Sequence, residues 1–486
     1  MVRSISLLSM ITAALAWAQP VSIDGNIILV QDPNGAINAL VGMQNMSILP
    51  SHQEQFCRQA YNTVRAAGIP DEFDGVITFT ASEQLTDIDN VWQGSPVRAD
   101  GTGYGRQNAP WANTYMSSKL GQCVFMGTLG RTMSLFGPPG PEALPSDPEG
   151  AWSPSIGIQI PGFSSLTGIE MMGHEYGHHW LLGIEFDQND GRGRQHFIRG
   201  YNEGDPNSGS MGYPNQHYSH NADSRSVMYG ECITDLGGGS FKFEGCPRKY
   251  SQIDQYLMGL RGPTEVNPMM VLEDPSAPGQ GVDSVAMGRS SGSMTVNGLT
   301  RHDISADEII RAMGSRIPGY PNAASCWRVA FIVVMAPGQT TVPQAMLDKV
   351  KRYAARWPQW FYGATDCRGT MDTRITGSGC VAIPNTCDAD GGTMMQPDSG
   401  VIAQDAGQPD AGAPEEDAGL DAGTPGEELD AGNEMMPPVG GGIGKDDTRV
   451  DTGKIRPGCG CNADPAVLVL FGAIALLGSR RRRAVH

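Results

Sequence analysis

His174-Glu175-Tyr176-Gly177-His178 places two histidines four residues apart, with a glutamate directly after the first. In a helix, positions i and i+4 share one face, so both imidazoles can bind one Zn²⁺ at about 2.0–2.1 Å. The carboxylate of Glu175 can then reach a water molecule on the metal and take its proton as general base. The pattern therefore predicts a helical zinc site with hydrolytic chemistry.

The residues on either side predict that this pentapeptide lies within a helix. Thr167 and Glu170 have the spacing of a capping box at a helix N-terminus, and Gly183 stands where a left-handed C-cap would end the helix. Apolar residues recur between these ends at spacings of three and four, namely Ile169, Met172, Tyr176 and Trp180. We therefore expect both histidines to lie mid-helix. The adjacent His179 points about 100° away and is expected to pack rather than to bind metal.

A catalytic zinc needs a third protein ligand besides two histidines. The compact pattern H-E-x-x-H-x-x-G-x-x-H is excluded, because Ile184 stands where its last histidine would be. Further along, His217 and His220 precede Ser226-Val227-Met228-Tyr229. This tetrapeptide resembles the methionine turn beneath the metal of metzincins. On that interpretation residues 185–216 form a long insertion and either histidine closes the site.

Carboxylates offer a different third ligand. Glu231 and Asp235 resemble the Glu-x-x-x-Asp element of gluzincins, in which the glutamate binds zinc and the aspartate orients the first histidine. Glu203 is a weaker candidate of the same kind. The ligand choice thus stays open between His217, His220 and Glu231 on local patterns alone.

A longer resemblance favours His217. Residues 40 to 377 are similar to a family of exported bacterial proteins with metalloprotease character, in which a His-Trp-Ser element matches His217-Tyr218-Ser219. The other segments that carry the resemblance are 174–178, 226–228, 250–260 and 364–370. It implies a zinc site of His174, His178 and His217, with Glu175 as the catalytic residue.

The two ends of the chain predict export. Arg3, the apolar run 5–17 and the small-x-small site before Gln19 make residues 1–18 a signal peptide. Residues 458–486 contain two cysteines, an apolar stretch and terminal arginines. They resemble the MYXO-CTERM sorting signals of myxobacterial surface proteins, which implies processing by membrane sorting machinery and attachment at the cell surface. A plain membrane anchor or a secreted product are the alternatives.

An acidic tether, residues 388–457, precedes this tail. Its residues 388–453 contain sixteen Asp/Glu and two Lys/Arg, so 2 − 16 = −14 of the formal charge of −18 lies there. Five Asp-Ala-Gly triplets alternate with Pro and Gly. Such a segment cannot bury enough apolar surface to fold, which predicts a disordered linker. The acidity of the protein therefore says nothing about its substrate.

Eight further cysteines form an even set, as disulfides in an exported protein require. Sequential pairing would give 57–123, 232–246, 326–367 and 380–387. No Cys-x-x-Cys motif occurs, so a zinc–thiolate site is not expected.

Residues 19–387 are expected to form one α+β, zincin-like metalloprotease region with a twisted N-terminal sheet, the active-site helix and a mainly helical C-terminal part. Strand patterns occur at 76–80, 123–126, 156–160 and 329–335. Helix patterns occur at 52–67, after Ser251 and Ser305, and at 343–363 with a break or kink at Pro358.

The predicted function is hydrolysis of peptide bonds outside the cell by a zinc-dependent endopeptidase, expected to be a monomer with protein or peptide substrates. The alternative is a surface adhesin or binding module that keeps a structural or vestigial zinc site. A closed four-ligand site would favour that alternative, whereas an open site would not. Nucleic-acid binding is disfavoured because no basic, aromatic-laced stretch occurs outside the terminal arginines.

Overall fold

The computed structural model describes residues 20–41, 51–82, 92–105, 107–129, 148, 167–181, 183–200, 217–244, 249–279 and 294–377. All of them belong to one of the two compact units into which the chain divides. The predicted signal peptide, tether and sorting signal lie outside the described residues, as does the predicted strand 156–160. No helix in the described ranges is both long and apolar enough to span a bilayer.

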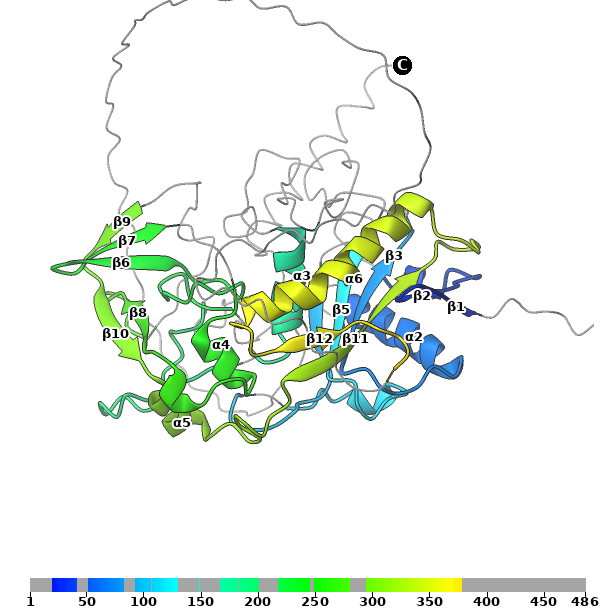
Figure 1. The fold of residues 1–486 in the computed structure, drawn as a ribbon. Coiled ribbons are helices and arrows are strands. Elements are labelled where there is room, and N and C mark those ends of the chain that lie inside the picture. Colours follow the sequence, from blue (N-terminus) through cyan, green and yellow to red (C-terminus); the bar gives the residue numbers. More distant parts are fainter. Residues whose placement is uncertain are drawn as a thin grey trace, which may run out of the picture. The chain divides into compact units, whose positions relative to one another are not determined.

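A mixed, seven-stranded sheet forms the centre of this unit (Figure 1). Its order is β1-β2-β11-β3-β5-β4, and β12 pairs with β11. Strands β2, β11, β3, β5 and β12 run parallel, whereas β1 and β4 are antiparallel to their neighbours. The strands are β1 Val21–Asp24, β2 Ile27–Val30, β3 Gly75–Thr80, β4 Gln93–Pro96, β5 Gln122–Thr128, β11 Cys326–Val334 and β12 Thr370–Asp372.

Helices cover both faces of the sheet, because alternate side chains of its strands enter two different cores. Val76 packs with residues of α1 (Asn38–Val41) and α2 (His52–Ala66), whereas the next residue, Ile77, packs with α3 (Gly168–Gly177) and α6 (Gln344–Ala364). The parallel strands β2, β3 and β5 are accordingly buried throughout, as expected between two helical layers. Described residues therefore form an α/β/α arrangement around this sheet.

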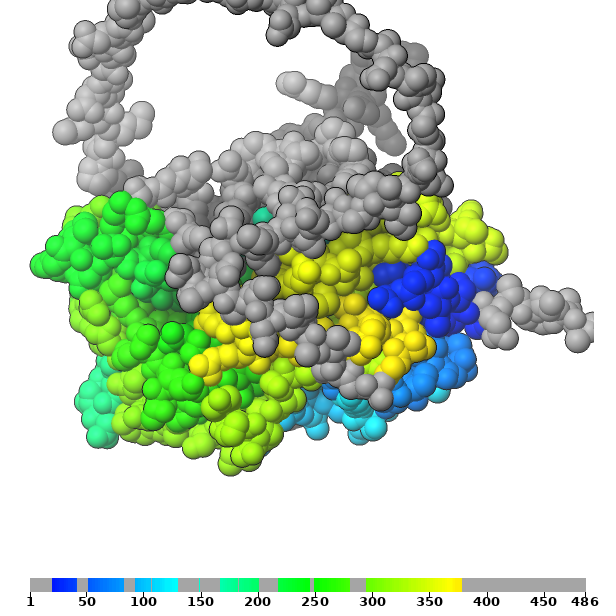
Figure 2. Space-filling view, in the orientation of Figure 1, coloured from blue at the N-terminus to red at the C-terminus, as the bar shows by residue number. Residues whose placement is uncertain are grey.

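The outer end of α6 lies beside the first hairpin. In the space-filling view the yellow-green residues of α6 meet the blue residues of β1 and β2 (Figure 2). Lys351 Nζ lies 2.6 Å from Asp24 Oδ1, so an ion pair joins the two elements at the surface. α6 runs through Pro358 as one continuous helix, so a break there is wrong, whereas a kink at Pro358 stays a prediction. Thr373 Oγ1 donates to the Ala354 carbonyl (3.4 Å), the acceptor that Pro358 leaves without its helical N–H partner.

The chain after α3 also builds two smaller sheets, so the expectation of a mainly helical C-terminal part is wrong. Strands β6 (Cys232–Gly237), β7 (Ser240–Glu244) and β9 (Met294–Asn297) form one, and β8 (Met269–Glu273) pairs with β10 (Thr300–Ile304) in the other. Nor is the main sheet purely N-terminal, because β11 inserts between β2 and β3. The helical elements of this part, besides α6, are α4 Gln252–Leu257, η3 Pro263–Glu265 and α5 Ala306–Met313, and an earlier short turn is η2 Ala112–Thr114.

Most other predicted elements are confirmed within a few residues. These are α2, β3, β5 and β11, together with α4 and α5, which begin after Ser251 and Ser305 with capping boxes. The coarser fold class, a mixture of helices and sheets compatible with α+β, is thus what the structure shows.

A disulfide between Cys57 and Cys123 joins α2 to β5, which confirms one predicted pair. Cys232, Cys326 and Cys367 are disulfide-bonded as well. Cys246, Cys380 and Cys387 lie outside the described residues, and the remaining pairings stay predictions.

Glu54 of α2 is a buried carboxylate with an expected effect on stability. Its Oε1 accepts from Tyr115 OH (2.8 Å), while Oε2 has no hydrogen-bond partner among the described residues. Burial outweighs both this bond and the charge of Arg58, and it raises the pKa of Glu54 to about 7 from 4.5. The folded state therefore holds the proton more tightly than the unfolded chain, so stability falls as pH rises from 4.5 to about 7.

We expect Glu54→Gln to remove this loss and to stabilise the protein at pH 8 by about 1–3 kcal/mol, since each pKa unit corresponds to about 1.4 kcal/mol. Urea unfolding of both proteins at pH 4.5 and pH 8 measures the effect. The wild type should lose stability between the two values and the variant should lose less. Equal pH dependence in both proteins would show that Glu54 is not the group responsible.

Candidate metal centre

The helix that carries the two motif histidines begins as the sequence predicts. Thr167 Oγ1 accepts from the Glu170 N–H (3.3 Å), and the Thr167 N–H donates to Glu170 Oε2 (2.7 Å), which together form the capping box. The end of the helix differs from the prediction. α3 stops at Gly177 and His178 is its C-cap, so Gly183 does not end the helix and His178 does not lie mid-helix. His178 keeps helical backbone angles (φ −56°, ψ −13°), which leaves its side chain on the same face as His174.

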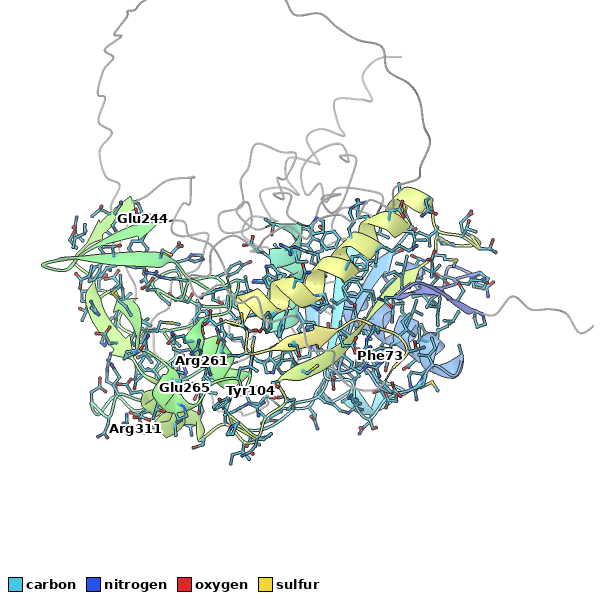
Figure 3. The ribbon with its side chains drawn as sticks, in the orientation of Figure 1. Phe73, Tyr104, Glu244, Arg261, Glu265 and Arg311 are labelled. Atoms are coloured by element: carbon cyan, nitrogen blue, oxygen red, sulfur yellow. A yellow bond between two sulfur atoms is a disulfide. The ribbon has the colours of Figure 1, made fainter. Side chains whose placement is uncertain are left out.

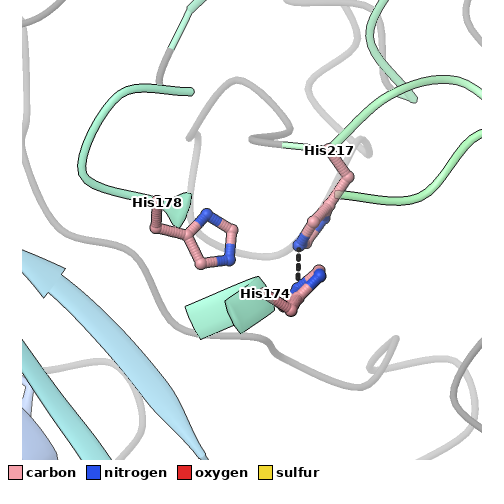
Figure 4. A group of neighbouring side chains, drawn as sticks. All are labelled: His174, His178 and His217. Atoms are coloured by element: carbon pink, nitrogen blue, oxygen red, sulfur yellow. Dashed lines mark hydrogen bonds between the residues drawn. The ribbon is translucent and has the colours of Figure 1, made fainter. Parts of the chain in front are cut away.

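Three histidines meet at this helix end (Figure 4). The Nε2 atoms of His174 and His217 lie 3.1 Å apart. One ligand nitrogen from each of these two residues and one from His178 all lie within 4.8 Å of one another. His174 and His178 are fully buried and His217 is half-buried. Within the described ranges no other group of three potential ligands comes together in this way.

The hydrogen bond of His174 fixes which of its nitrogens faces the cluster. Its Nδ1 lies 2.6 Å from the carbonyl oxygen of Val227. A carbonyl only accepts, so Nδ1 carries the proton and Nε2 presents a lone pair towards His217. Burial, together with the neighbouring His174, His178 and His220, lowers the pKa of His217 well below its usual range. The lowered pKa of His217 favours the neutral imidazole that binds a metal, and the Nδ1–H bond of His174 to a carbonyl is the arrangement usual for a metal-binding histidine.

The three imidazoles fit a metal ion. A tetrahedral Zn²⁺ at about 2.0–2.1 Å from each ligand separates the ligand nitrogens by roughly 3.3 Å. The 3.1 Å separation of His174 Nε2 and His217 Nε2 is close to that value. Imidazole ligands suit zinc, copper, iron and nickel, so the cluster shows a site that could hold a metal ion without fixing which one.

Glu175 lies beside the cluster and is held by the edge strand β4. Its Oε2 accepts from the Gly94 N–H (2.7 Å) and lies 3.9 Å from His178 Nε2. The Glu175 carbonyl accepts from Gln122 Nε2 (3.0 Å) on β5. A Cβ added at Gly94 would lie 2.0 Å from that carbonyl oxygen, so the strand can approach α3 only with glycine here. Gly94 and Gln122 are not predicted by any motif in the sequence; a glycine inside a strand is the one signal of close approach there.

Met228 and Tyr229 pack against the ligands. Met228 is fully buried, and its Sδ lies 2.4 Å from where a Cβ at Gly177 would be, so it occupies the helix surface next to the histidines. Tyr229 adopts a left-handed backbone conformation (φ 71°), and its ring centroid lies 4.6 Å from that of His174 and 4.3 Å from that of His217. Met228 and Tyr229, from the segment predicted to be a methionine turn, therefore lie beside the helix that carries the two motif histidines.

The alternative third ligands bond to each other. His220 Nδ1 and Glu231 Oε1 are 2.7 Å apart in a buried pair. Asp235 accepts from Arg301 Nη1 (3.0 Å) on β10 and does not orient His174, whose Nδ1 is held by Val227. The structure thus brings His217, not His220 or Glu231, to the two motif histidines. Glu203 lies outside the described residues.

Asp100 anchors the turn that follows α3. Its carboxylate accepts from Trp180 Nε1 (3.1 Å) and Arg316 Nη2 (2.9 Å). The Arg316 guanidinium in turn lies 4.4 Å above the ring of Tyr104, which is labelled in Figure 3. His179 Nε2 lies 3.8 Å from Asp100 Oδ2 and its ring contacts Trp180, so this histidine packs, as expected.

Segment 250–260 bonds to α3 and to segment 364–370, and both segments also carry the family resemblance. Tyr250 OH donates to the carbonyl of Gly173 (2.6 Å), the residue before His174. Asp366 accepts from Gln255 Nε2 (2.9 Å) and Arg261 Nη2 (2.6 Å), which ties segment 364–370 to segment 250–260. Tyr250 therefore fixes α3 next to His174, and Asp366 joins the segment that carries Tyr250 to segment 364–370.

Comparison with known proteins adds no relative to these observations: no family model matches the chain, and no curated protein or solved structure matches it. The interpretation of the site therefore rests on the geometry of its own residues.

Proposed function

We propose that this protein is a zinc-dependent endopeptidase of zincin type, which acts outside the cell on protein or peptide substrates. The observation that carries the proposal is the cluster of His174, His178 and His217 with a buried carboxylate, Glu175, next to it. Three protein ligands and a nearby general base are the set of groups that catalytic zinc sites use.

The imidazoles of His174, His178 and His217 would hold Zn²⁺, which, when bound, would supply a Lewis acid able to polarise the scissile carbonyl and to lower the pKa of water towards about 7. Glu175 takes a proton from the attacking water and hands it to the leaving amine as the peptide bond breaks. The Gly94 N–H fixes Glu175 Oε2, which restricts the rotation of the carboxylate. A positioned base of this kind contributes about 10²–10⁴ to the rate.

The position of β4 supports the binding of a peptide substrate in an extended conformation. Within the described sheet, β4 pairs with β5 on one side and stands at the edge on the other. It contacts α3 at Glu175 through Gly94. A peptide that adds to this edge as a further strand would have its backbone aligned near the histidines. We therefore favour an endopeptidase over a hydrolase of small molecules.

Metal removal tests the proposal. We expect the full chain to contain about one zinc and to cleave casein or a peptide library, to lose that activity after chelation, and to regain it with one equivalent of Zn²⁺. Metal analysis and a fluorescent peptide assay measure both properties. One zinc per chain without cleavage of any protein or peptide would replace the proposal with a binding module at the cell surface.

A further inference from the structure

Asp254 of α4 is a fully buried carboxylate that receives three hydrogen bonds. The donors are Ser226 Oγ (2.6 Å), Tyr218 OH (2.8 Å) and the Ser251 N–H (2.7 Å). Only the last belongs to the capping box of its own helix, and a capping residue needs no more than that. The other two donors come from segments 28 and 36 residues earlier in the chain, so Asp254 does more than cap α4.

The bond from Tyr218 leads to the third histidine. Tyr218 follows His217 directly, and its N–H donates to the carbonyl of Met228 (2.9 Å). The next residue, Ser219, donates its N–H to the carbonyl of Ile198 (2.9 Å). The backbone after His217 is therefore held by main-chain bonds, and the phenol of Tyr218 adds a side-chain bond to Asp254.

The bond from Ser226 leads to the first histidine. Ser226 precedes Val227, whose carbonyl accepts from His174 Nδ1 (2.6 Å) and so sets the orientation of that ring. The Ser226 hydroxyl donates to Asp254 and accepts from the Met228 N–H (3.0 Å). The Met228 N–H and the Val227 carbonyl belong to the same planar peptide unit. The Ser226 hydroxyl, which Asp254 holds, therefore fixes the direction of the Val227 carbonyl.

We propose that Asp254 is a positioning residue of the metal centre, whose one carboxylate fixes His217 through Tyr218 and His174 through Ser226 and Val227. The inference rests on the metal site of the proposed function, but it concerns metal affinity rather than hydrolysis. A carboxylate has acceptor sites for all three donors, whereas the amide of asparagine offers one oxygen and turns two donor protons towards the remaining donors. Asp254→Asn therefore breaks at least one of the three bonds without changing the side-chain size.

The experiment measures metal affinity of the full chain by competition with a zinc chelator, and the ligand geometry by the absorption spectrum of Co²⁺. We expect Asp254→Asn to weaken Zn²⁺ binding by about 10–100-fold, as for other groups that orient metal ligands, and to change the Co²⁺ spectrum. Tyr218→Phe removes the bond from the phenol to Asp254, and Ser226→Ala removes the hydroxyl that bonds both Asp254 and the Met228 N–H. Each variant should give a smaller loss than Asp254→Asn. Tyr218→Phe should add less in the Asp254→Asn background than it does alone, since both changes act on the same hydrogen-bond network around residue 254.

Two controls separate positioning from folding. Glu308 occupies the same capping-box position in α5, so Glu308→Gln should leave metal affinity and spectrum unchanged. Val64→Ala creates a cavity in the core on the other face of the sheet and should lower stability without changing affinity. If Asp254→Asn does not fold, Tyr218→Phe and Ser226→Ala still test the proposal.

Wild-type affinity and an unchanged Co²⁺ spectrum in folded Asp254→Asn, or in both Tyr218→Phe and Ser226→Ala, would overturn the inference. An equal loss of affinity in Val64→Ala would do the same, because the effect would then follow from stability. If the wild-type protein binds zinc but cleaves nothing, the proposed function is rejected. The comparison of zinc affinity between the wild type and the Asp254→Asn variant then still tests the inference.

Discussion

Glu175→Gln is expected to lower the kcat for peptide hydrolysis by about 10²–10⁴-fold while one zinc stays bound, because glutamine cannot accept the proton of the attacking water. The amide keeps an oxygen that can accept from the Gly94 N–H, so the side chain can hold its place beside β4. The imidazoles of His174, His178 and His217 are untouched by the change. Single-turnover cleavage of a fluorescent peptide, with metal content measured on the same sample, gives both quantities.

Glu170→Gln is the matched control for this prediction. Glu170 lies in the same helix and closes the capping box with Thr167, a role that glutamine also fills. It should retain activity and metal. Full activity of Glu175→Gln would exclude Glu175 as the base, and loss of zinc in that variant would show that the carboxylate supports the site rather than the reaction.

Local patterns in the sequence predicted the start of α3 correctly because capping depends on residues three positions apart. Thr167 and Glu170 form the expected box. The predicted end of the helix at Gly183 was wrong because contacts with residues distant in the sequence decide where α3 ends. Asp100, far away in the sequence, binds Trp180 in the turn after Gly177, and no pattern around Gly183 reports that bond.

In the sheet and the site, too, local patterns predicted single elements, whereas contacts between distant residues decided their arrangement. A buried strand near residues 329–335 was readable as an apolar, β-branched run, but its place between β2 and β3 follows from topology that no local pattern contains. The histidine cluster agrees with the motif and with the resemblance of segment 217–219. Gly94 bonds to Glu175 across 81 residues of the sequence, and Asp254 acts on the site from the neighbouring helix α4. The spacing of residues along the sequence reveals neither contact.

His217→Ala is expected to weaken zinc binding by about 10²–10³-fold. Binding free energies of about 10–16 kcal/mol for four-ligand zinc sites amount to roughly 2.5–4 kcal/mol per ligand, and 1.4 kcal/mol is a factor of ten. Two histidines, His174 and His178, would remain, and their nitrogens stay within reach of one ion. Competition with a chromogenic chelator at constant pH measures the affinity.

His220→Ala and Glu231→Ala are the variants that make this prediction decisive. Each breaks the buried 2.7 Å bond between His220 and Glu231, so each should lower thermal stability. Neither group belongs to the described three-histidine cluster, so zinc affinity should change by less than about tenfold, the lower end of the range for groups that only support ligands. Full zinc affinity in His217→Ala combined with a large loss in Glu231→Ala would assign the third position to the glutamate, and the same result in His220→Ala would assign it to that histidine.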